Sequence, residues 1–113
     1  MCRILQRYEE SYEESVEAYE QCIRLNPRDA LAYYNKGESL QDLKRYNEAL
    51  EAYEQALLFK PDDITGLVNK GGALLLRKRY REALAVYGRI LQIDPDNVIA
   101  KNNKAWVLSM LRL

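Results

Sequence analysis

Residues 33–55 read YYNKGESLQDLKRYNEALEAYEQ, a stretch with the apolar pattern typical of helices and with a glycine in its middle. The apolar and small positions recur at helical spacing: Tyr33, Gly37, Leu40, Ala49, Leu50, Tyr53 and Leu57. A glycine inside a helix costs about 1 kcal/mol relative to alanine. Gly37 therefore needs a physical reason, and so does Gly71, which follows it 34 positions later.

An internal repeat of 34 residues runs through the chain. The residues that recur at this step are Pro27, Pro61 and Pro95; Tyr12, Tyr46 and Tyr80; Tyr19, Tyr53 and Tyr87; Asn35, Asn69 and Asn103; and Lys36, Lys70 and Lys104. Residues 30–63 and 64–97, aligned without a gap, are identical at 14 of 34 positions. Self-similarity at a fixed period of this length predicts an array of small structural units that stack on one another.

Each repeat has the start and stop signals of two helices joined by a short turn. Asp29, Asp63 and Asn97 follow the proline-containing turns and are suited to cap the next helix. Each proline ends a helix, because it disfavours helical geometry in the residue before it. We predict helices over residues 2–9, 13–25, 30–43, 47–59, 64–77, 81–93 and 98–112, with basic turns at 44–46 and 78–80 and one extra residue near Glu10-Ser11.

The two glycines are explained if the helices of one repeat pack closely. We expect Gly37 and Ala49 to face each other across one helix pair, and Gly71 and Ala83 across the next. Small side chains let two helix backbones approach, and a large ring such as that of Tyr53 would then wedge beside the contact. Packing between the helices would offset the low helix propensity of glycine.

The pattern Tyr33-x-x-Lys36-Gly37-x-x-Leu40, followed by Tyr46, Ala49, Tyr53, Ala56 and Pro61, resembles the tetratricopeptide repeat (TPR). The next unit repeats it with Leu67, Lys70, Gly71, Leu74, Tyr80, Ala83, Tyr87, Ile90 and Pro95. Two departures are the lysine before each glycine, where the family has leucine, and tyrosine or leucine in place of its tryptophan. Neither threatens the fold, because a lysine stem packs along apolar surface.

The resemblance implies an all-α fold, a right-handed α-solenoid of helix-turn-helix repeats in a single domain of residues 1–113. The expected parts are a partial first repeat (1–29), a second repeat (30–63), a third repeat (64–97) and a capping helix or truncated fourth repeat (98–113). Lys101 stands where Tyr33 and Leu67 stood, which suits a terminal helix with a polar outer face.

The resemblance also implies a function, because in this family the first helices of successive repeats line a concave groove that commonly holds a peptide. The groove residues expected by analogy are Tyr34, Asn35, Glu38, Val68, Asn69, Leu76, Asn103, Trp106 and Met110. Further positions of the same face are Leu31, Gln41, Thr65, Gly72, Ile99 and Asn102. The predicted function is therefore a non-catalytic scaffold for a peptide or protein segment.

Two features of this predicted groove have alternative interpretations. The row Asn35, Asn69 and Asn103 has donors and acceptors for the backbone of a bound segment, or it is part of the structural consensus of the repeat. Trp106, the single tryptophan, is either a binding residue, forming an apolar floor with Val68, Leu76 and Met110, or a packing residue that closes the terminal helix.

Several other functions have little support in the sequence. Some TPR domains grip the carboxylates of chaperone C-termini with basic residues, but here Tyr34, Thr65 and Ile99 occupy those positions. The lysine row could favour an acidic ligand, although solvated lysines or lysines lying over the helix pair explain it as well. Residues 77–81 form a basic cluster on a turn, and the net charge of zero argues against nucleic acid.

Catalysis, metal binding and membrane insertion are not indicated. There is no histidine, no nucleophile beside a recognisable base and no glycine loop that would cradle a phosphate, so we expect no enzymatic activity and no cofactor. Cys22 fits a small core residue, and with Cys2 it does not indicate a disulfide framework or metal site. The glutamates of residues 9–17 read as a solvated helical face. No apolar run is long enough to cross a membrane or to act as a signal peptide, so we expect a cytoplasmic protein.

The charge distribution raises an alternative function. Residues 1–63 contain eight Lys/Arg and fourteen Asp/Glu, a balance of −6, and residues 64–113 contain nine and three, a balance of +6. Such a split would allow head-to-tail self-association of an acidic end with a basic end, giving homo-oligomers. A further alternative is that the chain is a targeting arm of a larger protein.

Overall fold

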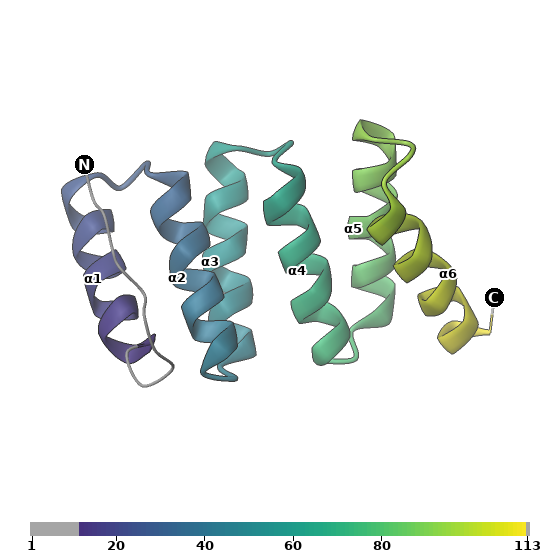
Figure 1. Ribbon diagram of the computed structural model, residues 1–113, viewed down its shortest axis with the longest axis horizontal. Helices are drawn as coiled ribbons and strands as arrows, with labels where there is room; N and C mark the ends of the chain where they lie inside the picture. Colours follow the sequence, from purple (N-terminus) through teal and green to yellow (C-terminus); the bar gives the residue numbers. More distant parts are fainter. Residues whose placement is uncertain (1–11, 113) are drawn as a thin grey trace. The chain divides into compact units, whose positions relative to one another are not determined.

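The computed structural model describes residues 12–112, which contain six α-helices and no strand (Figure 1). The helices are α1 (Tyr12–Leu25), α2 (Ala30–Asp42), α3 (Tyr46–Phe59), α4 (Ile64–Leu76), α5 (Tyr80–Ile93) and α6 (Val98–Leu111). This confirms the all-α, helical-repeat fold. The helix predicted over residues 2–9 and the extra residue near Glu10-Ser11 lie outside the described residues. Within residues 12–112, no helix has the length and apolar character that crossing a membrane requires.

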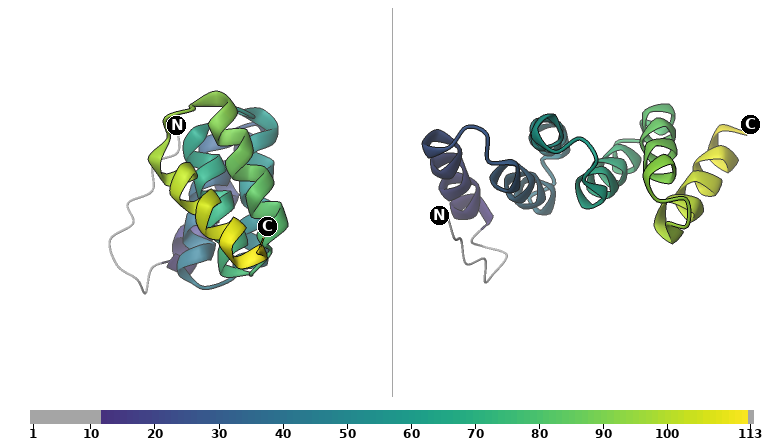
Figure 2. Two further views of the ribbon diagram at one scale, coloured as in Figure 1. Left: turned by 90° about the vertical axis from the view of Figure 1, so that its right-hand side faces the viewer. Right: turned by 90° about the horizontal axis from the view of Figure 1, so that it is seen from above.

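The chain divides into two compact units, unit 1 (Met1–Pro61) and unit 2 (Asp62–Leu113). In unit 1, α2 packs on both α1 and α3, and in unit 2, α5 packs on both α4 and α6 (Figure 2). Each unit therefore has one central helix and its own apolar core. The grouping of all repeats in a single domain stays a prediction.

The helix starts and turns follow the local signals of the sequence. The side chains of Asp29, Asp63 and Asn97 cap α2, α4 and α6 by accepting hydrogen bonds from backbone N–H groups at 2.9–3.2 Å, as predicted. The two basic turns pass through Lys44 and Lys78, which have positive φ values of 62° and 58°. Backbone hydrogen bonds hold this left-handed geometry, for example from Arg45 N to Leu40 O at 2.8 Å. The turn thus reverses the chain within a few residues in both units.

The start of α3 and of α5 lies one residue earlier than predicted, at Tyr46 and Tyr80. No side-chain hydrogen bond caps either start. Instead, the arginine just before each helix pairs with the glutamate three residues further on. Arg45 bonds both carboxylate oxygens of Glu48 at 2.8 and 2.6 Å, and this pairing holds the pKa of the Glu48 carboxyl below its usual value.

The two glycines are explained by a tyrosine ring that lies against each of them. A Cβ atom on Gly37 would lie 2.5 Å from Cε1 of Tyr53, and one on Gly71 would lie 2.9 Å from Cε1 and Cζ of Tyr87. Both tyrosines are 0% exposed. A ring therefore packs tightly at each glycine, whereas the expected pairing of Gly37 with Ala49 and of Gly71 with Ala83 stays a prediction. In each unit it is the tyrosine ring that lies directly against the missing side chain.

The cores of both units consist of small and medium apolar residues around these tyrosines. The buried residues of unit 1 include Val16, Tyr19, Cys22, Ala32, Leu40, Ala49, Leu50, Tyr53 and Ala56. Those of unit 2 include Leu67, Ala73, Leu74, Ala83, Val86, Tyr87, Ile90, Ala100 and Val107. Most of these residues repeat at a 34-residue step, so the two cores use equivalent positions of the repeat.

Cys22 is 3% exposed, which confirms its predicted place in the core. It is disulfide-bonded rather than a free thiol, so the expectation of an ordinary small core residue describes its burial but not its bonding. The bonding partner lies outside the described residues.

We predict that Gly37→Ala lowers the free energy of unfolding by about 1–3 kcal/mol, and Gly37→Leu by more, because the new side chain would collide with the Tyr53 ring. Gly88→Ala is the matched control, since a Cβ atom on this helical glycine of α5 meets no atom within 4 Å. The control should gain up to about 1 kcal/mol from helix propensity. Urea unfolding followed by circular dichroism measures both changes, and an unchanged Gly37→Ala midpoint would contradict the packing account.

Candidate functional site

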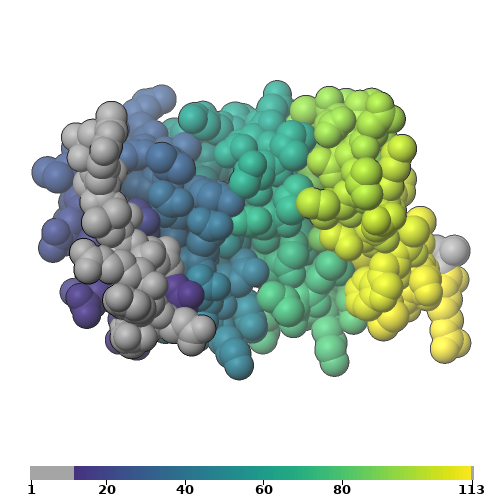
Figure 3. Space-filling view, viewed as in Figure 1, coloured from purple at the N-terminus to yellow at the C-terminus, as the bar shows by residue number. Residues whose placement is uncertain are grey.

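Unit 2 has an open hollow of about 440 Å³ between α4 and α6. It is lined by Gly72, Leu75 and Leu76 from the C-terminal part of α4 and by Asn103 and Trp106 from α6. Figure 3 shows the face of unit 2 on which α4 (teal) and α6 (yellow) reach the surface. The volume falls within the range of about 300–1,000 Å³ typical of ligand sites. The hollow is therefore the candidate site of this unit.

The lining of the hollow is apolar apart from one amide, and none of its five residues is charged. Leu76 is 53% exposed and Trp106 is 48% exposed, so each has about half of its surface available to a ligand. The indole of Trp106 meets the ring of Tyr80 edge to face, with centroids 5.8 Å apart and an interplanar angle of 69°. This contact supports the indole on one side.

Asn103 is fastened to the core of unit 2. Its Nδ2 donates a hydrogen bond to Oη of the fully buried Tyr87 at 3.2 Å. Burial raises the pKa of the Tyr87 hydroxyl, and the hydrogen bond from Asn103 acts in the opposite direction. Asn103 thus links the wall of the hollow to the tyrosine that packs against Gly71.

The corresponding face of unit 1 has polar contacts instead. Glu38 occupies the position of α2 that Gly72 occupies in α4, one repeat later. Tyr34 Oη donates to Glu38 Oε2 at 3.2 Å, and the ring of Tyr34 lies 6.0 Å from that of Tyr53. Tyr53 Oη donates to Gln41 Oε1 at 2.9 Å. Side chains of this face thus hydrogen-bond to one another or to the core.

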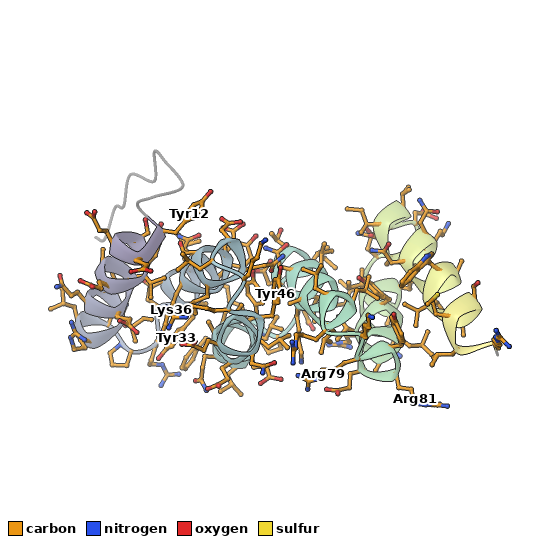
Figure 4. The ribbon with its side chains drawn as sticks, turned by 90° about the horizontal axis from the view of Figure 1, so that it is seen from below. Tyr12, Tyr33, Lys36, Tyr46, Arg79 and Arg81 are labelled. Carbon is orange, nitrogen blue, oxygen red and sulfur yellow. The ribbon has the colours of Figure 1, made fainter. Side chains whose placement is uncertain are left out.

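Unit 1 has a smaller hollow of about 230 Å³ along α2 and α3. Its lining includes several charged residues: Lys36, Glu48, Glu51 and Glu54. Lys36 pairs with Glu20 of α1 at 3.2 Å, and Figure 4 shows Lys36 on α2. The ion pair joins α2 to α1, so at Lys36 the structure favours a lysine that lies over a helix pair.

Three sequence models of a known family match the chain. The TPR repeat model matches residues 5–44, and two tetratricopeptide repeat models match residues 30–63 and 64–97. The chain belongs to the tetratricopeptide repeat family. A search of curated protein sequences found no match to this TPR chain.

Solved structures with the same fold are also TPR domains. The Arabidopsis OM64 TPR domain is 24% identical, covers 88% of this chain and 83% of its own, and superposes with a TM-score of 0.80. The first TPR of Spaghetti (RPAP3), bound to the HSP90 peptide SRMEEVD, is 20% identical. The match covers 93% of this chain and 83% of that domain, with a TM-score of 0.85. The second TPR domain of human RPAP3, in complex with the HSP70 peptide SGPTIEEVD, is 23% identical. The match covers 88% of this chain and 82% of that domain, with a TM-score of 0.80. At these identities the likeness shows the fold.

The structure brings together three of the predicted groove residues of this TPR chain around the hollow: Leu76, Asn103 and Trp106. Gly72, expected on the same face, joins them. Val68 and Met110 do not line the hollow, and the apolar floor formed by Val68, Leu76, Trp106 and Met110 together stays a prediction. Met110 is 48% exposed on α6.

Sequence reasoning missed Leu75 in the lining and Tyr80 as the partner of Trp106. Leu75 is equivalent to Gln41, 34 residues earlier, and Gln41 was expected on the groove face. Applying the 34-residue step to Gln41 therefore predicts Leu75 on the same face. The sequence predicts Tyr80 in the basic turn 78–80, whereas in the structure it is the first residue of α5. The remaining groove candidates Tyr34, Asn35, Glu38 and Asn69 stay predictions.

The basic cluster of residues 77–81 is separate from the hollow. Arg79 pairs with Glu82 through two hydrogen bonds at 2.9 and 2.7 Å. Figure 4 shows Arg79 and Arg81 extending from the start of α5 on the side away from α6. Among residues 12–112, no group of acidic, cysteine or histidine side chains is arranged to hold a metal ion, and Glu9 and Glu10 lie outside this range.

We predict that Asn103→Ala lowers the free energy of unfolding by about 1–3 kcal/mol, because it removes the hydrogen bond to the buried Tyr87 hydroxyl. In a Tyr87→Phe background the same substitution should cost clearly less, since the hydroxyl is already absent. Urea unfolding of the four proteins of this double-mutant cycle gives the coupling energy. Equal costs in both backgrounds would show that the hydrogen bond does not stabilise the fold.

Proposed function

We propose that this TPR chain is a non-catalytic module that binds a peptide or protein segment on the first helices of its repeats. The observation that carries the proposal is the uncharged, half-exposed surface around Trp106 and Leu76, between two such helices. Contiguous apolar surface of this kind marks interaction sites on soluble proteins. The two RPAP3 domains, which share the fold, are complexes with peptides.

Burial of the exposed parts of Leu76 and Trp106 would supply the affinity. Removing apolar surface from water is worth roughly 25 cal/mol per Å². Tryptophan is enriched among residues that dominate binding energy, and the contact with Tyr80 holds this indole before any ligand arrives. The predicted groove residue Asn69 of α4 would add a polar contact within the same unit, and Tyr34 and Asn35 remain groove candidates of unit 1.

The peptides in the two RPAP3 complexes end in acidic residues, and the side chains of this chain suit such ends poorly. Tyr34, Thr65 and Ile99 occupy the positions where basic residues were sought. Tyr34 is hydrogen-bonded to Glu38, whose negative charge would repel a carboxylate. We therefore propose a ligand other than a chaperone C-terminus.

A peptide-display selection tests this function. A library of random peptides is selected on the immobilised chain, and recovered peptides are synthesised and titrated while the emission of Trp106 is followed. We expect saturable binding at micromolar concentrations or tighter, whereas SRMEEVD and SGPTIEEVD should produce no saturable change. Failure to enrich any peptide above a bare matrix would reject the binding function. Saturable binding of SRMEEVD or SGPTIEEVD would reject the exclusion of chaperone tails.

Self-association is a second candidate, favoured by the opposite charges of the two parts of the sequence. In unit 2, Arg77, Lys78, Arg81 and Arg112 are exposed and form no ion pair with described residues. On α1, the exposed carboxylates of Glu13, Glu14 and Glu17 likewise form no ion pair with described residues. Contacts between such groups would be electrostatic and heterologous.

Light scattering at low and high salt tests this candidate. If the charged ends meet, the mean mass should exceed that of a 13.2 kDa monomer at low salt and return to it at high salt. Arg77→Glu combined with Arg81→Glu should also restore the monomer at low salt. A monomer at every ionic strength would exclude head-to-tail assembly and leave the peptide-binding function untouched.

A further inference from the structure

The adjacent glycines Gly71 and Gly72 of α4 differ in what packing demands of them. A Cβ atom on Gly71 would lie 2.9 Å from the ring of Tyr87, so a larger residue is excluded there. A Cβ atom on Gly72 would meet nothing within 4 Å. Glycine is a poor residue in the middle of a helix, and the fold does not require it at this position. Gly72 thus weakens α4 with no gain in internal packing.

Gly72 lies in the lining of the hollow and has no side chain to fill it. It lies opposite Trp106, and Leu75 and Leu76 lie beside it in the lining. The equivalent positions of α2 and α6 have Glu38 and Trp106, both of them large side chains. In unit 1 the Glu38 side chain is hydrogen-bonded to Tyr34, so that face has a polar pair where unit 2 has open space.

The chemistry of the lining selects what would enter. A charged group in the hollow would lose water and find no counter-ion among the five lining residues. An aliphatic or aromatic side chain would bury the exposed halves of Leu76 and Trp106. Asn103 uses Nδ2 to hold Tyr87, and Oδ1 forms no hydrogen bond with the described residues. This oxygen is therefore able to accept a backbone N–H from a segment passing the rim.

We propose that the hollow opened by Gly72 is the anchor pocket of the binding site, and that it takes a bulky uncharged side chain of a polypeptide segment. The inference rests on the proposed function and specifies its ligand class. The pocket would select an apolar side chain from within the segment. The space beside Gly72, where no side chain stands, and the indole of Trp106 would set the size of the side chain that fits.

The test fills the pocket from the protein side. Peptides selected on the wild-type chain are measured against Gly72→Leu, which places a side chain in the hollow. We expect an affinity loss of about tenfold or more. Gly88→Leu is the matched control, because Gly88 lies in α5 outside the hollow and a Cβ atom there also meets nothing within 4 Å. It should change affinity by less than about twofold.

Two measurements keep the test decisive if Gly72→Leu disturbs the fold. Replacing the apolar anchor of a selected peptide by alanine should weaken binding to the unmodified chain by about tenfold. A fresh selection on Gly72→Ala, whose added methyl group makes the pocket shallower, should recover peptides with smaller anchors. These results would support the pocket without relying on the larger substitution.

Contrary outcomes separate this inference from the proposed function. If selected peptides bind the wild type and folded Gly72→Leu equally well, or if their shared residue is charged, the anchor pocket is wrong and peptide binding stands. If a single-stranded RNA pool binds in its place and shows the same dependence on residue 72, the ligand class is wrong. If the wild-type chain selects no peptide at all, the proposed function falls and the inference falls with it.

Discussion

The structure depends on one contact that occurs in each unit, a buried tyrosine ring packed against a helical glycine. Tyr53 lies against Gly37 and Tyr87 against Gly71, so close that even a methyl group would collide with the ring. The ring fills the space that the missing side chain leaves. Because both tyrosines are completely buried, this contact is also the centre of each core.

In unit 2 the same tyrosine positions the candidate site. Its ring packs on α4 at Gly71, and its hydroxyl accepts the hydrogen bond from Asn103 of α6. One side chain of α5 thus ties together the two helices that form the walls of the hollow. Trp106 lies one turn beyond Asn103 on α6 and Gly72 lies next to Gly71 on α4, so the geometry of the hollow follows from the core contact.

The two units show how one repeat pattern supports two kinds of surface. The core positions are alike, because each must fit a tyrosine between a pair of helices. The outward positions of the first helices are free of this demand, and they differ: Tyr34 and Glu38 form a polar pair, whereas Gly72 leaves open space. The basic turn before α5 is a third surface, directed away from α6 (Figure 4). A repeat protein thus varies its binding chemistry without altering its packing.

The sequence by itself determined the six helices of residues 12–112 to within a residue or two, the caps of α2, α4 and α6, and the need for small residues at Gly37 and Gly71. These features depend on spacing within one helix and on neighbours a few residues away, which a single sequence contains. Only the tertiary structure decided that Tyr80 supports Trp106, that Asn103 bonds to Tyr87, and that Leu75 lines the hollow while Val68 and Met110 do not. Such contacts depend on how helices cross and on how far each side chain reaches, and residues many positions apart in the chain meet only after the helices have packed.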